Sequence, residues 1–512
     1  MKQLKNIIYS ALFAASILLL TACDDWFRIL PKSEIVFGDF WQNESDVLAV
    51  VGSCYRGMNT AGFVERLIVW GEVRSDNVIR GFDVSNATNN ILNLNLNAAN
   101  AYSYWGEFYT VINYCNTVIK YAPIVQSKDP DFKPENLNGY LAEVKGIRAL
   151  CYFTLLRSFR NIPLITEPYA KDDQTFEKAQ ENPDELLDFL IEDLKSVENQ
   201  SFDGWNNGTY TKGRITKNAI RAILADMYLW KNDYRNCIAY CDKILDSDGS
   251  LQLENSTVYN EAVFFTGNSK ESIFELQFNE NDLPNNGVYE MYGKINGDKR
   301  NAQLSAYSFS KMLSPLFIST DLRGKDAFLP VGTMLPIMKY IALRSENSTG
   351  LLNEKDYTAI YGANWIFYRL SDIYLMKAEA IVEIGEDLEA ALALVSKTFD
   401  RANPDLGANS LQFSLYNTRQ AMRDLVLCER QREFIFEGKR YFDLLRHVLR
   451  DGSANNIISS YVMKKYDYLV GSTVRSKLID INAWYMPINA DELRANSLLK
   501  QNPYYVTVSY IE

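Results

Sequence analysis

The densest group of potentially reactive side chains lies near the C-terminal end of the chain, between Cys428 and Arg446. Charged residues recur there at steps of three and four, the spacing that places side chains on one face of a helix: Glu429, Arg432, Glu433, Glu437 and Arg440. Such a column could serve carboxylate acid–base chemistry or could form a structural ion-pair clasp. We favour the clasp, because arginines and glutamates in register neutralise each other and leave no free base. Gly438 either ends one helix and begins the next or lets another backbone approach.

The sequence offers few other catalytic or metal-binding groups. It has no Gly-x-Ser-x-Gly elbow, phosphate-binding glycine loop or His-Glu-x-x-His motif, and its single histidine is His447. Without a Cys-x-x-Cys motif or a second histidine, a zinc site lacks ligands. A pair of glycosidase carboxylates needs no local motif, so a secreted glycoside hydrolase stays open. With 64 acidic residues in the chain, solvated or ion-paired carboxylates are the better interpretation, and we expect no cofactor, no metal and no catalysis.

The composition is that of a globular protein with a large core, with 512 residues of which 47% are hydrophobic and 23% charged. The 53 basic and 64 acidic residues give a net charge of −11. This acidity argues against nucleic acid as a partner, because phosphate backbones attract basic surfaces. Aromatic residues make up 13% of the chain, including 32 Tyr. Their rings could pack in a core or stack on a flat ligand face.

The N-terminus predicts export and lipid anchoring. Lys2 and Lys5 precede an apolar run over residues 7–20, which is too short for a transmembrane helix and typical of a signal-peptide core. Small residues follow before Cys23, as in a lipoprotein cleavage site. We therefore predict that residues 1–22 are a lipoprotein signal peptide. Cys23 would become the lipidated first residue, which tethers the mature protein to a membrane without spanning it.

Much of the chain carries helical periodicity, arranged in paired helices. Small and aromatic residues combine as in tetratricopeptide-type hairpins over residues 137–159, 213–230 with 234–245, and 365–380 with 387–401. An Asn-rich stretch at 86–100 is expected to be a loop. Short apolar runs such as Ser272–Phe278 could be strands. We predict a mostly α fold with an irregular, loop-rich region and a few short strands.

The stretch from Cys428 to Arg446 resembles the hallmark of the SusD/RagB family, the surface glycan-binding lipoproteins that work with an outer-membrane transporter. The matching residues are Glu429, Arg430, Glu433, Phe436, Glu437, Gly438, Arg440, Phe442, Asp443, Leu444 and Arg446. Further segments similar to the family follow in order at 145–153, 162–165, 213–217, 368–380 and 485–504. The resemblance therefore covers nearly the whole mature chain.

This resemblance implies one SusD-like domain over residues 23–512. We expect it to comprise an N-terminal helical, tetratricopeptide-like half (23–245), a loop-rich insert with short strands (246–362) and a C-terminal helical half (363–512) that holds the hallmark 428–446.

The resemblance also implies a function. The protein would be a non-catalytic lipoprotein that binds oligosaccharide or polysaccharide and delivers it to a SusC-like TonB-dependent outer-membrane transporter, with the helical hairpins as scaffold for that interface. Asp24 and Asp25 resemble the family's signal for display on the outside of the outer membrane, although other bacteria use such acids for inner-membrane retention. The RagB branch implies peptides as the alternative cargo, which the Asn-rich segment 86–100 keeps open.

The family does not keep its ligand-binding residues in a fixed motif, so candidates come from loops with aromatic and polar side chains. Rings would stack on sugar faces, and polar groups would bond to hydroxyls. One group precedes the Asn-rich stretch, a second lies between Asn279 and Asn301, and an exposed-loop tryptophan is a weaker candidate: Arg74, Asp76, Asn77 and Arg80; Tyr289, Tyr292 and Arg300; and Trp205. For each tyrosine, packing in the core is the alternative role.

Overall fold

Helices account for most of the described chain, which confirms the prediction of a mostly α fold. The computed structural model describes residues 40–508 apart from 171–173, 206, 248, 280–285, 294, 297–298, 301, 308–315, 328–334, 346–356, 361, 408–409 and 467. The predicted signal peptide (1–22) and Cys23 lie outside these residues. In the part that the structure describes, no helix has the length and apolarity needed to cross a membrane.

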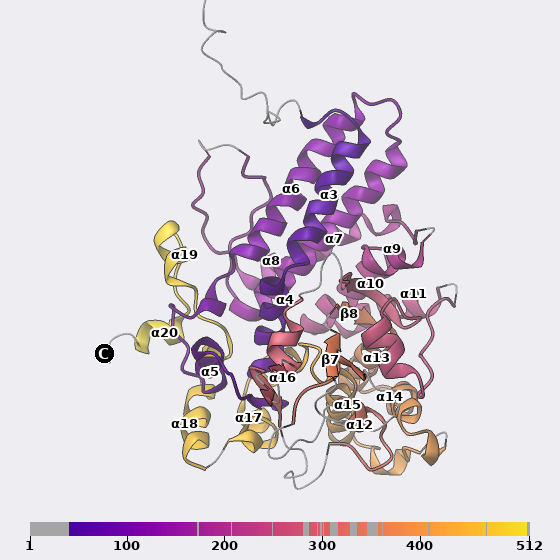
Figure 1. The fold of residues 1–512 in the computed structure, drawn as a ribbon, viewed down its shortest axis with the longest axis vertical. Helices are drawn as coiled ribbons and strands as arrows, with labels where there is room; N and C mark the ends of the chain where they lie inside the picture. The colour runs from indigo at the N-terminus through magenta and orange to yellow at the C-terminus, as the bar shows by residue number, and fades with distance from the viewer. Residues whose placement is uncertain are drawn as a thin grey trace, which may run out of the picture.

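Long helices packed side by side form the N-terminal part of the fold, seen at the top of Figure 1. Helix α3 packs on α6, and α6 packs on α7. Pro134 opens α7 at a position whose backbone N–H has no helical partner, so proline costs little there. The helices of this part are α3 (Glu44–Met58), α4 (Ala61–Ile68), α5 (Asn86–Leu92), α6 (Gly106–Gln126), α7 (Pro134–Phe159) and α8 (Pro183–Lys195).

The predicted helical hairpins are present. Thr216 accepts a hydrogen bond from the Ala219 N–H at the start of α10, and Asp233 does the same for Asn236 at the start of α11. Helix α11 packs on α13, and α13 packs on α14 and α15. The bounds are α9 (Gly208–Gly213), α10 (Lys217–Trp230), α11 (Tyr234–Leu245), α12 (Arg323–Asp326), α13 (Leu370–Ile384), α14 (Leu388–Ala402) and α15 (Arg419–Phe434).

In the part of the chain that the structure describes, the strands form antiparallel pairs, and two of these pairs, β1 with β5 and β2 with β8, join distant parts of the sequence. The pairs are β1 (Val78–Arg80) with β5 (Leu304–Ala306), β2 (Ser272–Leu276) with β8 (Trp365–Arg369), β3 (Ile295–Asn296) with β4 (Lys299–Arg300), and β6 (Ala342–Ser345) with β7 (Tyr357–Ile360). The strand predicted within Ser272–Phe278 is thus confirmed.

Two local predictions are wrong. The helix expected from Trp365 begins only at Leu370, because residues 365–369 are drawn into pairing with β2. The Asn-rich segment expected to be a loop begins with helix α5, whose first turn is capped by the Ser85 side chain. Burial of Ile91 and Leu92 on this helix outweighs the low helix propensity of asparagine.

The C-terminal segment returns to the N-terminal helices, so the two ends of the described chain share one core. The Met486 N–H donates to the Ser158 carbonyl at the end of α7, and the Ala490 N–H donates to the Ala98 carbonyl. One buried apolar cluster includes residues from Trp41 to Tyr505. The segment comprises α16 (Arg440–Asp451), α17 (Asn455–Ser460), α18 (Tyr468–Leu478), α19 (Ala490–Ala495) and α20 (Pro503–Val508).

The hallmark stretch is not one helix. Helix α15 ends at Phe434 and α16 begins at Arg440, and the turn between them places Phe436 and Gly438 at φ values of 64° and 68°. Gly438 therefore fulfils both of its expected roles. It separates two helices, and its carbonyl lies where a Cβ atom on Gly71 would be only 1.8 Å away, so the two backbones are in close contact.

Candidate functional site

The charged residues of the hallmark form a buried ion-pair network, but their partners come from other elements. Glu433 on α15 accepts from Arg369 at 2.5 Å, from Arg401 at 2.5 Å and from Arg323 at 2.8 Å. Burial alone would raise the pKa of Glu433, but the charges of these three arginines outweigh it and hold that pKa well below its usual range. The predicted residues do form ion pairs, but most of them pair with other elements and not within one helical column.

Glu437 forms a second branch of this network. It accepts from Arg369 Nη2 at 2.8 Å and from Lys339 Nζ at 2.7 Å. Burial opposes ionisation, yet the neighbouring cations lower the pKa of Glu437 to about 2. For Lys339 the balance is reversed, because burial outweighs the attraction of Glu437 and lowers the lysine pKa to about 8. Two further members differ in burial: Glu429 is fully buried and accepts from Arg323, while Arg432 is partly exposed and pairs with Glu429 at 3.2 Å.

Three predicted ligand-binding residues belong to this interior and not to an exposed loop. Asp76 accepts two hydrogen bonds from Arg440, at 2.8 and 2.9 Å, and Asn77 accepts from Gln431. Arg74 donates to the Trp484 carbonyl at 2.6 Å and lies 3.9 Å above the ring of Tyr441. The placement of Arg74, Asp76 and Asn77 on a ligand-facing surface is therefore wrong, because partners far along the chain hold them in the core.

The second group of candidates and Trp205 are divided by the structure. Tyr292 is fully buried and its hydroxyl donates to the Phe436 carbonyl at 3.2 Å, so the packing alternative holds for it. Tyr289 is half-buried at the start of a π-helical turn, Tyr289–Gly293. Trp205 is half-buried beneath the Arg214 guanidinium, 3.7 Å away, and is not an exposed aromatic. The side chain of Arg300 lies outside the described residues.

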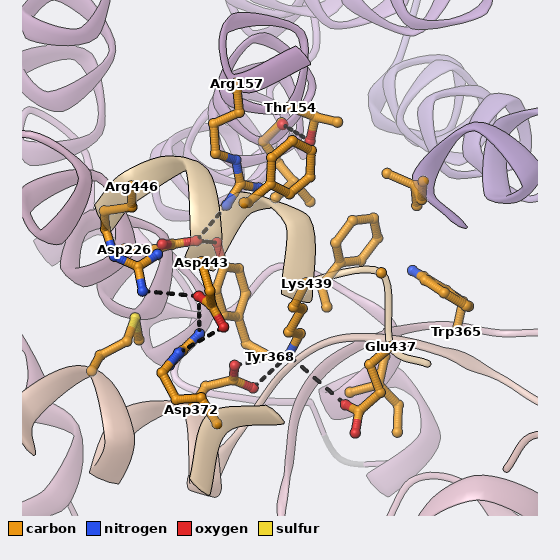
Figure 2. A pocket seen from close by; sticks show the side chains of 18 residues that line it. Thr154, Arg157, Asp226, Trp365, Tyr368, Asp372, Glu437, Lys439, Asp443 and Arg446 are labelled. Carbon is orange, nitrogen blue, oxygen red and sulfur yellow. Dashed lines mark hydrogen bonds and ion pairs between the residues drawn. The ribbon is translucent and has the colours of Figure 1, made fainter. Parts of the chain in front are cut away.

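A cavity of about 50 Å³ lies beside the network, between α7 and the turn that joins α15 to α16. Figure 2 shows ion pairs across it, with Lys439 directed at Asp372 and Glu437, Asp443 close to Arg446, and Arg157 reaching Asp226. Small-molecule sites usually enclose about 300–1,000 Å³. This cavity is too small for a sugar or a peptide, and its charges already neutralise one another.

A hydrolase needs a carboxyl group with a raised pKa, and beside the hallmark the fully buried Glu72 has one. Burial raises the pKa of Glu72 to about 7, against the lowering effect of a hydrogen bond from Asn77. A general acid has a pKa in this range, but Glu72 is fully buried and accepts from Asn77 at 2.6 Å. Within the described residues, no group of three His, Cys, Asp or Glu side chains could hold a metal ion.

The segments that hold the remaining predicted residues, Arg80 and Tyr289, are linked by backbone hydrogen bonds through strand β5 and the residue before it. Arg80 is exposed and pairs in register with Leu304. Past the strand, the Gly81 N–H donates to Gln303 O at 2.7 Å, and the Gln303 N–H donates to Glu290 O at 3.1 Å. Two loops more than 200 residues apart are therefore linked through one residue, Gln303.

Phe82 is the main residue of this surface that the sequence did not single out. Its side chain is 64% exposed, between exposed Arg80 and exposed Asp83. A Cβ atom on Gly81 would lie 2.2 Å from the Ala302 carbonyl, so the close backbone contact fixes where Phe82 emerges. The available signal was an apolar residue inside the polar run Arg80–Asp83. We call Arg80, Phe82, Asp83 and Tyr289 the β1 surface.

Comparisons with known proteins agree on one family. Residues 333–505 match the model of the SusD family. SusD-like protein P38 of Formosa agariphila is 23% identical over 489 residues, covering 87% of this chain and 92% of that protein. SusD-like protein P2 of the same organism is 22% identical over 476 residues, covering 86% of this chain and 90% of that protein.

Solved structures show the same fold. A SusD superfamily protein from Bacteroides vulgatus superposes with a TM-score of 0.72 at 23% identity, covering 91% of this chain and 99% of its own. A SusD-like protein described as laminarin-binding has a TM-score of 0.66 at 22% identity, covering 90% of this chain and 100% of its own.

Proposed function

Because the chain belongs to the SusD/RagB family, we propose that it is a carbohydrate-binding protein whose ligand lies on the β1 surface. The observation that carries this proposal is the joining of Arg80, Phe82 and Asp83 to the Tyr289 segment through β5. An aromatic ring offers a flat apolar face for the C–H side of a sugar, while a cation and a carboxylate can bind its hydroxyls. A laminarin-binding neighbour of the same fold makes a glycan the first ligand class to test.

The test is binding of the detergent-solubilised full chain to a panel of polysaccharides by affinity gel electrophoresis. Phe82→Ala and Arg80→Ala are each expected to weaken the retained interaction at least tenfold without changing the melting temperature. Tyr210→Ala is the matched control, because Tyr210 is 58% exposed on α9 and lies outside the β1 surface. Unchanged affinity in both test variants would remove the β1 surface from the ligand site.

The same panel addresses the two alternatives. Release of shortened sugars, lost on replacing one carboxylate, would favour a glycoside hydrolase over a binding protein. Retention of peptides but not of any polysaccharide would favour RagB-like cargo. The geometry favours neither alternative. The exposed group on the β1 surface is the Phe82 ring, flanked by charged side chains, and Glu72, whose carboxyl pKa is about 7, is buried.

We further propose that the protein is anchored to the outer membrane through Cys23, faces the cell exterior, and passes its ligand to a SusC-like TonB-dependent transporter. The family and the residues around Cys23 support this proposal. Cys23→Ala should release the protein from the membrane fraction and abolish labelling by fatty acid. Co-purification of a large TonB-dependent porin with the wild-type protein, and its loss when the helical hairpins are mutated, would support the partner.

A further inference from the structure

An open cleft that shares no residue with the β1 surface lies where the end of α7 meets the C-terminal tail. Its volume is about 290 Å³, near the lower limit for small-molecule sites. Its lining includes Arg160 and Asn161 after the end of α7, Tyr485, and residues 500–503 before and at the start of α20. In Figure 1, α19 and α20 lie beside the N-terminal helices, which agrees with the hydrogen bond from Lys500 N to the Gln180 side chain.

The charge of this cleft is opposite to that of the whole chain. The chain carries a net charge of −11, yet the residues that line the cleft include two cations, Arg160 and Lys500, and no Asp or Glu. Both cations are exposed, and in the described part of the chain neither forms an ion pair. Most arginines of the interior, in contrast, are paired with carboxylates. The cleft therefore presents two cations that form no ion pair with a carboxylate among the described residues.

The amide side chains of the cleft are already committed to its walls. Gln501 accepts from Ile488 N and donates to Ile488 O, both at 2.8 Å. Gln180 donates to the Asn161 carbonyl at 3.0 Å, and Asn502 donates to the Asn482 carbonyl at 3.0 Å. These bonds fix the shape of the cleft. Arg160 donates one long hydrogen bond, from Nη1 to Asn482 Oδ1 at 3.4 Å, and its other guanidinium nitrogens and the Lys500 amine are the cationic groups that a ligand could bind.

Arg160 is held in a backbone conformation that favours glycine. Its φ is 68° and its ψ is −70°, and the Asn161 N–H donates to the Phe159 carbonyl across it at 2.9 Å. This is a γ-turn of the rare, strained kind. A residue with a side chain is retained there at a cost in stability, and such outliers cluster at ligand sites. The turn directs the guanidinium over the Tyr485 ring, 5.7 Å from its centroid.

We propose that this cleft binds the carboxylate of an acidic sugar unit, a uronate within an oligosaccharide. Arg160 and Lys500 bind the carboxylate, and Tyr485, together with Phe159, contacts the apolar part of the unit. The size of the cleft suits one sugar ring rather than an extended protein surface. The proposal rests on the proposed function only in taking the ligand to be a saccharide, since the cleft is built from residues outside the β1 surface.

The experiment measures affinity by isothermal titration of the full chain with oligogalacturonate, oligoglucuronate and oligomannuronate, each paired with its methyl-esterified, uncharged form. At least one free-carboxylate oligomer is expected to bind ten times more tightly than its ester, with affinity that falls as salt is raised. Arg160→Gly should weaken that binding at least tenfold without lowering the melting temperature, because glycine relieves the strained turn. A purely structural Arg160 would instead lower the melting temperature on replacement.

Lys500→Glu provides a second variant that is safe for folding, because Lys500 is exposed. It should weaken binding of the charged oligomer and leave the ester unaffected, while Lys128→Gln, at an exposed lysine outside the cleft, should change neither. Equal binding of acid and ester, no binding of any of the three acids, or unchanged affinity in both cleft variants would overturn the proposal. Phe82→Ala distinguishes the two proposals. If Phe82→Ala leaves glycan affinity unchanged, the β1 surface is not a ligand site, but Arg160→Gly should still weaken binding of the charged oligomer.

Discussion

Asp76 and Arg440 lie 364 positions apart in the sequence, yet their side chains form a two-point ion pair in the core. Read locally, Asp76 was a polar loop residue and Arg440 a member of a helical column, and both interpretations followed from neighbours within a few positions. What decides the role of a charged residue here is whether a distant partner compensates the cost of burying it. Arg80 has no such buried environment, and it stays on the surface as predicted.

Arg369 is the residue whose loss should be most damaging. It is fully buried and donates to Glu271, Glu433 and Glu437, so Arg369→Met leaves three buried carboxylates short of a partner. We expect the free energy of unfolding to fall by about 3–5 kcal/mol, measured by chemical denaturation. Arg235→Met is the control, because its pair with Glu386 is largely exposed and its loss should not shift the midpoint. Equal midpoints for the two variants would contradict a structural role for the network.

Tyr289 and Tyr292 should respond in opposite ways. Tyr292→Phe removes the buried hydrogen bond to Phe436 O and should lower the free energy of unfolding by about 1 kcal/mol, with glycan affinity unchanged. Tyr289→Ala should weaken glycan binding, because this half-buried ring is part of the proposed β1 surface. Thermal melts and affinity gels on the same preparations measure both effects. A loss of affinity in the Tyr292 variant alone would reverse the assignment of the two rings.

At the scale of elements, the joint between the N-terminal helices and the hallmark depends on two glycines. Gly71 lies in the π-helical turn Val69–Val73, and Gly438 lies in the turn that joins α15 to α16. Each contributes a bare backbone surface, since a Cβ atom on Gly71 would overlap the Gly438 carbonyl at 1.8 Å. Because both partners are backbone, neither can move aside as a flexible side chain could.

Replacing Gly71 and Gly52 by alanine should change the free energy of unfolding in opposite directions. Gly71→Ala forces the two turns apart and should lower the free energy of unfolding by about 1–3 kcal/mol or more. Gly52→Ala lies in the exposed interior of α3 with no atom within 4 Å of its Cβ, and should raise that energy by about 0.5–1 kcal/mol. Urea denaturation of both variants tests this, and destabilisation by the Gly52 change would show that open space is not what distinguishes them.

Elements that carry their own stop and start signals could be predicted from the sequence, and elements defined by distant pairing could not. Helix α11 has the predicted bounds, Tyr234–Leu245, because Asp233 caps it and its apolar face is continuous. Residues Trp365–Arg369 look helical beside α13, and only strand β2, some 90 residues earlier, makes them extended. In the same way, Arg80 and Tyr289 could be selected as polar or aromatic loop residues, but their meeting through Gln303 depends on the β1–β5 pair.

Taken over the whole molecule, the acidic excess is distributed unevenly. Some carboxylates are buried beside arginines, as in the group formed by Glu271, Glu433 and Glu437 around Arg369. The cleft at Arg160 has no carboxylate among its lining residues. A net charge of −11 therefore says little about the ligand of any one site, because the field near a site is set by the groups that line it.

Three buried carboxylates with lowered pKa values should make the protein sensitive to acid. The pKa of Glu437 is lowered to about 2, and those of Glu433 and Glu379 lie well below their usual range. In the unfolded chain these groups titrate near pH ~4.3. Their contribution to the free energy of unfolding is therefore complete above about pH 5 and is lost as the pH falls toward about 2. For Glu437 alone, the contribution present at neutral pH is about 3 kcal/mol. Denaturation midpoints of the wild-type protein should decline as the pH is lowered from 7 to 3. The midpoint of Glu437→Gln should be lower at pH 7 and should decline less steeply with pH. Added salt should change this decline little, because the pairs are buried and screened weakly. An identical slope in the variant would mean that exposed carboxylates, not the Arg369 network, control acid unfolding.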